Sequence, residues 1–253
     1  ADYIAKAKEE QKAIYYLTGD KLESLSHSPK IELFSKNNIQ VLLLTDPIDQ
    51  LWVQSAGEYA DKPFVSVSAE DLRSEDLPGG EKADPTDAEW PFAQELASLL
   101  GDSVEAVRPS ARLVDSPACF VTKGESASPQ LRRILKSMGQ PLPEEKRILE
   151  VNREHPLVQR AEKLAQEGDS EQMNAMGQLL LDMAWIAEGE LPPDPAALSR
   201  RITQLLQRIA IAAERGELRQ HFVFSHRCVH QWAAIMPSRR WWRKPARHNG
   251  PER

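Results

Sequence analysis

The sequence has little of several residue types and patterns, and each shortage excludes a class of protein. Only two of the 253 residues are cysteine, Cys119 and Cys228, which excludes a disulfide framework and favours a reducing compartment. The longest aliphatic run, residues 41–44, is far shorter than the roughly 20 apolar residues that span a bilayer. The first residues show neither a basic nor an apolar leader region, so we expect no signal peptide and a cytoplasmic location.

Motifs of common catalytic and cofactor sites are missing as well. Gly79-Gly80 is not followed by Lys and Ser or Thr, so it is no phosphate loop, and no HExxH, CxxC or GxSxG motif occurs. His226, Cys228 and His230 could offer three metal ligands on a strand, but their spacing is not that of a common structural zinc site. We therefore predict no catalytic, cofactor-binding or metal-binding residue, and metal-dependent chemistry stays a third hypothesis.

Charge is distributed unevenly along the chain. Hydrophobic residues make up 41% and charged residues 28%, which is typical of a folded protein with a net charge of −6. Residues 214–253 nevertheless carry nine Lys and Arg against three Asp and Glu, with three of the six Trp. We expect this basic tail to be atypical, either disordered or a terminus without selected function. The competing hypothesis is a nucleic-acid or anionic-surface binding module that acts through residues 239–244 (RRWWRK).

The first part of the chain has the pattern of a small α/β unit. A helix is predicted over residues 3–18, and strands are predicted over 39–44 and 64–67. Between the strands, Asp46-Pro47 predicts a helix start. Residues 69–89 contain eight acids, two bases and the Gly79-Gly80 pair, which indicates a solvated linker and a domain boundary.

The second part predicts a helix-rich domain. Helices are expected over 90–100, 128–139, 156–167, 170–188 and 195–213, and strands over 104–107, 118–121 and 148–151. The last two helices carry apolar stripes joined by a short turn at Pro192-Pro193. These stripes could pack on the chain's own sheet or form a four-helix bundle with a second copy, and the pattern leaves both open. Likewise, the stripe of the 128–139 helix could be core or an exposed apolar patch.

Several motifs, in order, resemble the 90-kilodalton heat-shock chaperone family. Residues 11–19 (QKAIYYLTG), 44–49 (LTDPID) and 62–67 (KPFVSV) resemble the end of the family's middle domain. Four later segments resemble the family's C-terminal dimerisation domain: residues 112–118 (RLVDSPA), 150–152 (EVN), 155–156 (HP) and 200–206 (RRITQLL). The resemblance covers about residues 1–212 and is nearest to the family's bacterial members.

The resemblance implies a domain layout and a function. Residues 1–68 would be the α/β end of the middle domain, 69–89 the linker, and 90–213 an α/β dimerisation domain whose αα-hairpin forms a four-helix bundle in the dimer. Residues 214–253 would be the atypical tail. The implied function is homodimerisation and client binding within an ATP-dependent chaperone for protein folding. Its partners would be a second copy and unfolded client proteins, with no membrane, and nucleic acid would be a partner only under the competing hypothesis.

The resemblance also implies what the chain lacks and which residues bind. The ATP-binding domain would lie upstream, so we expect no enzymatic activity and no cofactor in this chain, with ATP and Mg in the full-length parent. The implied dimer-interface residues are Met176, Leu180, Met183, Leu198, Ile202, Leu205 and Ile209. The implied client-binding residues are Leu131, Ile134, Leu135, Met138, Leu51 and Trp52.

Overall fold

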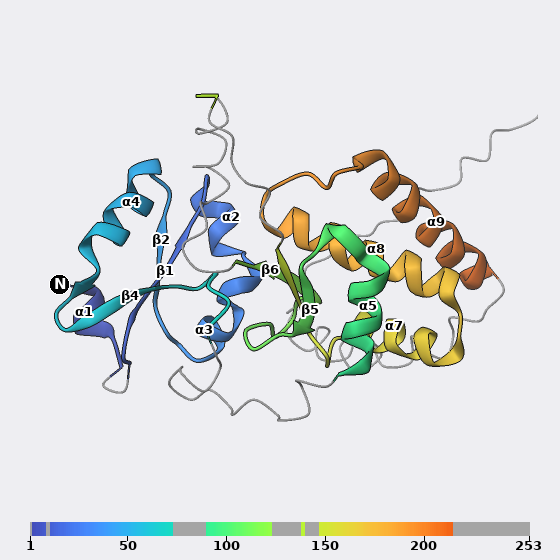
Figure 1. The fold of residues 1–253 in the computed structure, drawn as a ribbon, viewed down its shortest axis with the longest axis horizontal. Coiled ribbons are helices and arrows are strands. Elements are labelled where there is room, and N and C mark those ends of the chain that lie inside the picture. Colours follow the sequence, from blue (N-terminus) through green and yellow to red (C-terminus); the bar gives the residue numbers. More distant parts are fainter. Residues whose placement is uncertain (1, 9–10, 73–89, 123–137, 140–146, 215–253) are drawn as a thin grey trace, which may run out of the picture. The chain divides into compact units, whose positions relative to one another are not determined.

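The structure, a computed structural model, describes residues 2–8, 11–72, 90–122, 138–139 and 147–214. In this part the chain combines helices with two small β-sheets (Figure 1), so the prediction of a mixed α and β fold is confirmed. It divides into two compact units, Ala1–Arg201 and Ile202–Arg253, and both sheets belong to the first. No helix in the described part combines the length and the apolar character that crossing a membrane requires.

The first sheet is built around β1 (Ile14–Thr18), which has a parallel partner on each side. β2 (Val41–Leu44) pairs with one edge of β1, and β4 (Lys62–Ser66) pairs with the other. The short β3 (Glu58–Tyr59) adds antiparallel to β4, which gives the order β2-β1-β4-β3. Aliphatic and aromatic side chains dominate β1 and β2, as suits strands in a partly buried pleated surface.

Helices flank this sheet, and some of them contribute side chains to its core. They are α1 (Asp2–Lys6), α2 (Leu22–Ser26), the 3-10 turn η1 (Pro29–Ile31), α3 (Glu32–Lys36) and α4 (Pro47–Ala56). Phe34 packs edge-on against Tyr15 with ring centres 4.9 Å apart, and both side chains are buried. Helix α4 begins at a capping box, because the Asp46 carboxylate accepts the Ile48 N–H and the Asp49 carboxylate accepts the Asp46 N–H.

The single helix predicted over residues 3–18 is wrong. α1 ends at Lys6, and Ile14–Thr18 forms the central strand of the sheet. This strand consists mostly of β-branched and aromatic residues, and both of its edges are paired. Pairing with two strands that are distant in sequence outweighs the helical spacing of the apolar residues. The strand and helix predicted within 39–57 are confirmed.

The second sheet has three strands in the order β5-β7-β6. β5 (Ala106–Pro109) runs parallel to β7 (Ile148–Val151), and β6 (Ala118–Val121) runs antiparallel to it. Every residue of β6 and β7 is buried. Burial on both faces explains why these strands are nearly continuous apolar runs rather than alternating ones.

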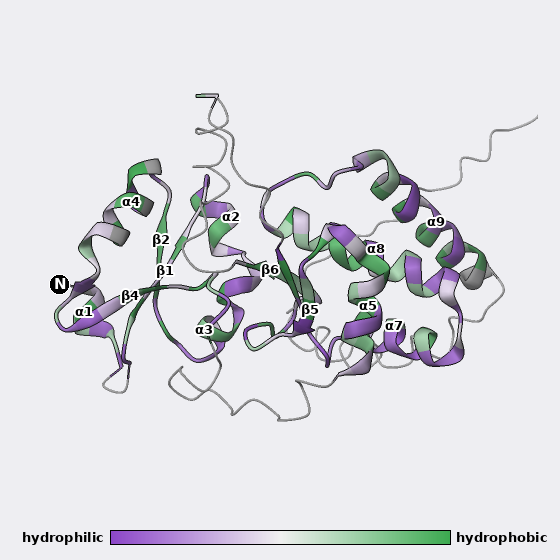
Figure 2. Cartoon of the chain, viewed as in Figure 1, coloured by the Kyte–Doolittle hydropathy of each residue, from purple (hydrophilic) through white to green (hydrophobic). Residues whose placement is uncertain are grey.

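Helices α5 (Pro91–Leu100), α7 (Pro156–Glu167) and α8 (Ser170–Ala187) lie together beside the second sheet (Figure 1), and the 3-10 turn η4 (Gly101–Ser103) follows α5. Their apolar faces form the largest core, in which Leu96, Leu149 and Leu164 are at most 2% exposed. Gly177 lets α8 approach α5 closely, because a Cβ there would lie 2.7 Å from Leu96 Cδ1. Figure 2 shows β2 and β6 largely hydrophobic and the helices banded, which matches one buried face per helix.

Helix α9 (Pro195–Glu214) starts at Asp194, whose carboxylate accepts the Ala197 N–H at 2.8 Å. Arg201, in its second turn, pairs with the buried Asp182 of α8, with Nε 3.0 Å from Oδ2. The helices predicted over 90–100, 156–167, 170–188 and 195–213 are confirmed, as are the strands at 118–121 and 148–151. The predicted helix over 128–139 lies almost entirely outside the described residues.

Candidate functional site

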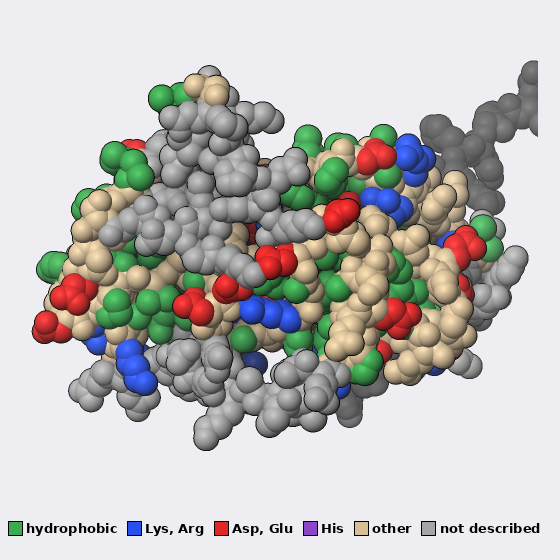
Figure 3. Space-filling view, viewed as in Figure 1, with side chains coloured by type: hydrophobic (Ala, Val, Ile, Leu, Met, Phe, Trp, Pro, Cys, Tyr) green, Lys and Arg blue, Asp and Glu red, His purple; other side chains and the backbone are tan. Residues whose placement is uncertain are grey.

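A cluster of exposed apolar side chains lies on α4 and the adjoining β3, and we term it the α4 face. Its members are Ile48, Leu51, Trp52 and Tyr59, which are 59%, 47%, 52% and 53% exposed. Figure 3 shows hydrophobic side chains at the edge of the molecule where Figure 1 places α4. Apolar side chains gathered at one exposed place mark interaction surfaces more often than scattered ones do.

Helix α4 packs inward through Val53, and Trp52 of the α4 face also reaches the sheet. Val53 is 2% exposed, and the Trp52 ring meets Phe64 of β4 at 5.5 Å between ring centres. Tyr59 lies opposite Lys62, two residues before Phe64, so it shares the sheet face on which Trp52 packs. The structure thus brings the predicted residues Leu51 and Trp52 together with Ile48 and Tyr59, which the sequence analysis did not assign.

A second apolar surface runs along α9, and we term it the α9 face. Ile202, Leu206 and Ile209 are 43%, 60% and 54% exposed, and their spacing of four and three residues places them on one side of the helix. The predicted residues Leu198 and Leu205 lie beside them on the same side and are half-buried.

The predicted interface residues of α8 have different surroundings. Met176 and Met183 are half-buried, but Leu180 is 0% exposed and belongs to the core that α8 forms with the second sheet. Leu180 is therefore removed from the interface set, because its side chain has no surface to offer a partner. The stripe on α8 extends over two sides of the helix, and the side that carries Leu180 packs on the chain itself.

Several predicted site residues lie outside the described part. Leu131, Ile134 and Leu135 are among them, whereas Met138 is described and is 68% exposed. The basic tail beyond Glu214, with its His and Cys cluster, is likewise outside. Among the described residues no group of three or more His, Cys, Asp and Glu is arranged to hold a metal ion.

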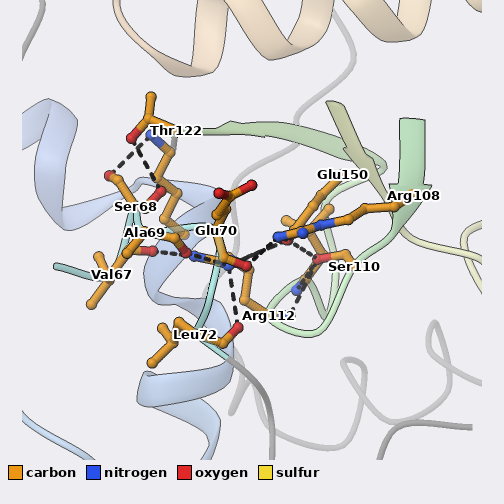
Figure 4. Close-up of polar contacts among 12 residues, drawn as sticks. Val67, Ser68, Ala69, Glu70, Leu72, Arg108, Ser110, Arg112, Thr122 and Glu150 are labelled. Carbon is orange, nitrogen blue, oxygen red and sulfur yellow. Dashed lines mark hydrogen bonds and ion pairs between the residues drawn. The ribbon is translucent and has the colours of Figure 1, made fainter. Parts of the chain in front are cut away.

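A buried ion cluster joins the two sheets (Figure 4). Arg112 and Glu150 are each 1% exposed, and Arg112 Nε lies 2.9 Å from Glu150 Oε2. The other Glu150 oxygen accepts from Arg108 Nη2 at 2.9 Å, and Ser110 Oγ donates to Oε2 at 3.0 Å. A carboxylate buried in a strand is costly unless it is paired and hydrogen-bonded, and Glu150 is both.

The same arginine also holds the segment that leaves the first sheet. Its two terminal nitrogens donate to the carbonyl oxygens of Val67, of Ala69 at 2.9 Å and of Leu72 at 3.4 Å (Figure 4). Leu72 is 8% exposed and belongs to the first core, so the start of the segment predicted as linker is packed. One side chain therefore fastens the exit of the first sheet to the central strand of the second.

Glu32, at the start of α3, adds a second tie between the same regions. Its carboxylate accepts the N–H groups of Val114 at 2.7 Å, Asp115 at 2.9 Å and Ser116 at 3.1 Å, and also the Ser116 hydroxyl. Burial by itself raises the pKa of Glu32. The bonds from the Ser116 hydroxyl and the three N–H groups outweigh burial, so the pKa lies below its ordinary value of 4.5.

These ionic ties were not predicted as functional residues. Arg112 and Glu150 entered the sequence analysis only within family motifs, and Glu32 did not enter it. The available signal was Glu150 itself, a carboxylate inside the apolar run of residues 148–151. Cys119, beside it on β6, is fully buried, and burial raises the pKa of its thiol far above the ordinary value of 9.0. That thiol is therefore no candidate nucleophile.

Comparison with known sequences places this fold in a family. The sequence model of the Hsp90 protein family matches residues 1–223. The chain therefore belongs to the Hsp90 family, which confirms the resemblance to the 90-kilodalton heat-shock chaperones.

Curated relatives carry the name Chaperone protein HtpG. The relative from Acinetobacter baylyi is 45% identical over 210 residues, which are 81% of this chain and 32% of the relative. The relative from Alcanivorax borkumensis is 41% identical over 206 residues, again 81% of this chain and 32% of the relative. The chain thus spans about a third of the length of the curated relatives it matches.

The family match corrects two predictions. The sequence analysis expected no enzymatic activity and no cofactor, because it placed the ATP-binding domain upstream of the first residue. The Hsp90 model matches residues 1–223, so the family match starts at the first residue of this chain and gives no ground for placing the ATP-binding domain upstream of it. Both exclusions are wrong: they were drawn from where the sequence begins rather than from the chemistry of its residues.

Replacing Arg112 with Met should destabilise the fold strongly. The variant leaves Glu150 buried without its main partner and three carbonyl oxygens without their donor, so the free energy of unfolding should fall by about 3–5 kcal/mol. Arg108→Met is the matched control, since the Arg108 side chain is 35% exposed and should cost only about 1 kcal/mol. Urea unfolding followed by circular dichroism measures both. Equal losses of unfolding free energy in the two variants would show that Arg112 contributes no more to stability than Arg108 does.

Because of Glu32, the free energy of unfolding should decrease as the pH falls. A carboxyl group whose folded pKa is depressed stabilises the fold above its unfolded pKa, here 4.5, and that contribution is lost as pH falls through the lower folded pKa. Between pH 7 and pH 3 the wild type should therefore lose more stability than Glu32→Gln. The exposed Glu23, changed to Gln, is the control and should follow the wild type. Parallel curves for the wild type and Glu32→Gln would exclude this role.

Proposed function

We propose that this chain is part of an ATP-dependent molecular chaperone of the HtpG type, in which it joins two copies and holds partly folded client proteins. Residues 1–68 correspond in this proposal to the end of the middle domain and residues 90–213 to the C-terminal dimerisation domain. Residues 69–89 connect them in sequence, and Leu72 at their start belongs to the first core. Support comes from the ordered family motifs and from two exposed apolar faces on one chain.

The α9 face is the observation that carries the dimerisation proposal. Ile202, Leu206 and Ile209 are exposed side by side on a 20-residue helix. Fully burying an exposed side chain of this kind contributes roughly 1.5–3 kcal/mol, so burying the remaining half-exposed surface of each contributes about half of that. In a symmetric dimer the same face is used twice, so each apolar residue contributes from both copies. A helical hairpin that pairs with its copy gives a four-helix bundle, which buries these faces.

The half-buried Met176 and Met183 of α8 extend the proposed interface. Methionine fits irregular contacts between helices because its side chain is unbranched and flexible. The two copies held in this way keep their other regions close together. Later contacts between those regions then become intramolecular, at a high effective concentration.

The α4 face supplies the proposed client surface. Trp52 and Tyr59 offer large rings, and Ile48 and Leu51 extend the same surface with aliphatic side chains. A partly folded chain exposes apolar side chains, so burial against the α4 face is favourable without any specific sequence. Met138, which is 68% exposed, offers a further contact from the predicted client-binding helix.

Changing Leu206 to Asp should split the proposed dimer. The variant removes an apolar contact in both copies, a loss of about 3 kcal/mol or more that raises the dimer dissociation constant at least ~100-fold. Light scattering on a size-exclusion column across a concentration series measures the change, and circular dichroism checks that the helices remain. Gln204→Asp is the control, because Gln204 is exposed on the opposite side of α9 and should leave the dimer intact. A wild-type monomer at every concentration would overturn the dimerisation proposal.

A further inference from the structure

Two acidic residues lie in the turn after α8, at the C-terminal end of the helix, where the helix dipole disfavours negative charge. Glu188 is the C-terminal cap of α8, and Glu190 follows it by two residues. The Glu188 N–H donates to the Ala184 oxygen at 3.2 Å, so the carboxylate lies at the negative end of an 18-residue helix. Cations from elsewhere in the fold offset the unfavourable charge of both acids.

Lys30 supplies one of these cations from the N-terminal part of the chain. It lies in η1, and its Nζ is 2.5 Å from Glu188 Oε1, with the two side chains 5% and 12% exposed. The same Nζ donates to Ser68 Oγ at 3.2 Å, just after β4. The ammonium group thus bonds at once to the exit of the first sheet and to the end of α8.

Arg147 supplies the other cation from the residue before β7. Its Nη2 is 2.9 Å from Glu190 Oε2, and the guanidinium lies 4.3 Å from the centre of the Trp185 ring and 5.4 Å from that of Phe120. One of its nitrogens, Nη1, has no hydrogen-bond partner within the described part of the chain. The ion pair with Glu190 is therefore the main compensation for burying this charge.

The turn held in this way leads directly into α9. Gly189 has a φ of +73°, and the Glu190 N–H donates to the Trp185 oxygen at 3.1 Å, which closes α8 in a left-handed turn. Four residues later Asp194 caps α9. The path from α8 to the first turn of α9 therefore depends on where Glu188 and Glu190 are held.

We propose that Lys30 is a positioning residue for dimerisation: together with Arg147 it clamps the turn after α8 and so sets the direction in which α9 starts. The inference rests on the proposed dimer. One buried ammonium group links the exit of the first sheet, at Ser68, to the end of α8, at Glu188. Dimer strength then depends on a residue that lies outside the dimer interface.

Lys30→Met tests this directly on the whole chain. The variant should raise the dimer dissociation constant by about tenfold or more, because an unpaired buried carboxylate pulls the turn toward water. Lys30→Arg keeps the cation and should restore most of the affinity. Lys163→Met, which removes an exposed pair with Glu167 on α7, is the control and should change nothing. Sedimentation equilibrium over a concentration series gives all three constants.

A second variant separates positioning from general loss of stability. Glu188→Gln removes the charge that needs Lys30, so it should weaken the dimer while changing the melting temperature less than Lys30→Met does. Adding Glu188→Gln to Lys30→Met should cause no further weakening, because the pair is already broken. Hydrogen exchange should rise in residues 188–194 of the single variants and stay unchanged in β1.

The outcomes distinguish this inference from the function on which it rests. A wild-type chain that never dimerises overturns the proposed function. A wild-type dimer whose dissociation constant is the same in Lys30→Met and Glu188→Gln overturns the positioning role alone. If Lys30→Met fails to fold, an unchanged dimer in Glu188→Gln is sufficient to overturn it.

Discussion

The connection between the two sheets depends on the buried ion pair of Arg112 and Glu150. A guanidinium and a carboxylate, each 1% exposed, are stable there only because nearly every polar atom is satisfied. The arginine uses its remaining N–H groups on the carbonyl oxygens of Val67, Ala69 and Leu72, so the backbone that leaves the first sheet is fastened to the middle of the second. Such a joint is rigid for a physical reason: any relative movement of these segments would leave a buried charge unpaired. The α4 face therefore belongs to a framework, within the first unit, whose segments hold fixed positions.

Whether an apolar side chain of a helix is buried or exposed depends on whether another element packs against that side of the helix. The cores take the apolar side of each helix that has a sheet beside it, as Leu180 shows on α8. Where no described element covers a side, large apolar residues stay exposed, as Trp52 does on α4 and Leu206 does on α9. Exposed surface of this kind is unfavourable for an isolated chain and favourable for one that binds. The proposed chaperone function assigns one surface to a client and the other to a second copy, so both exposures acquire the same physical explanation.

Signals between residues close in sequence predicted most of the helices and strands. The wrong predictions concern residues whose contacts are distant in sequence. Asp46 with its proline marked the start of α4, because capping is decided within one turn of chain. β1 was mistaken for helix because its strand character comes from partners more than twenty residues away. Glu150 was not recognised as an ion-pair partner, since Arg112 lies 38 residues from it and no spacing rule connects them. Leu180 was assigned to the interface because a stripe of apolar residues does not reveal which side meets the chain's own sheet. The exclusion of ATP failed for another reason, since it relied on where the sequence starts.

The proposed function requires that a second copy covers the α9 face while the α4 face stays free for a client. Hydrogen exchange of the intact chain, measured at low and at high protein concentration, distinguishes the two faces. The amides of α9 should exchange more slowly at high concentration, while those of α4 should exchange at the same rate at both. Exchange in α9 that does not change with concentration would exclude the proposed dimer interface, and equal slowing in both helices would exclude a free α4 face.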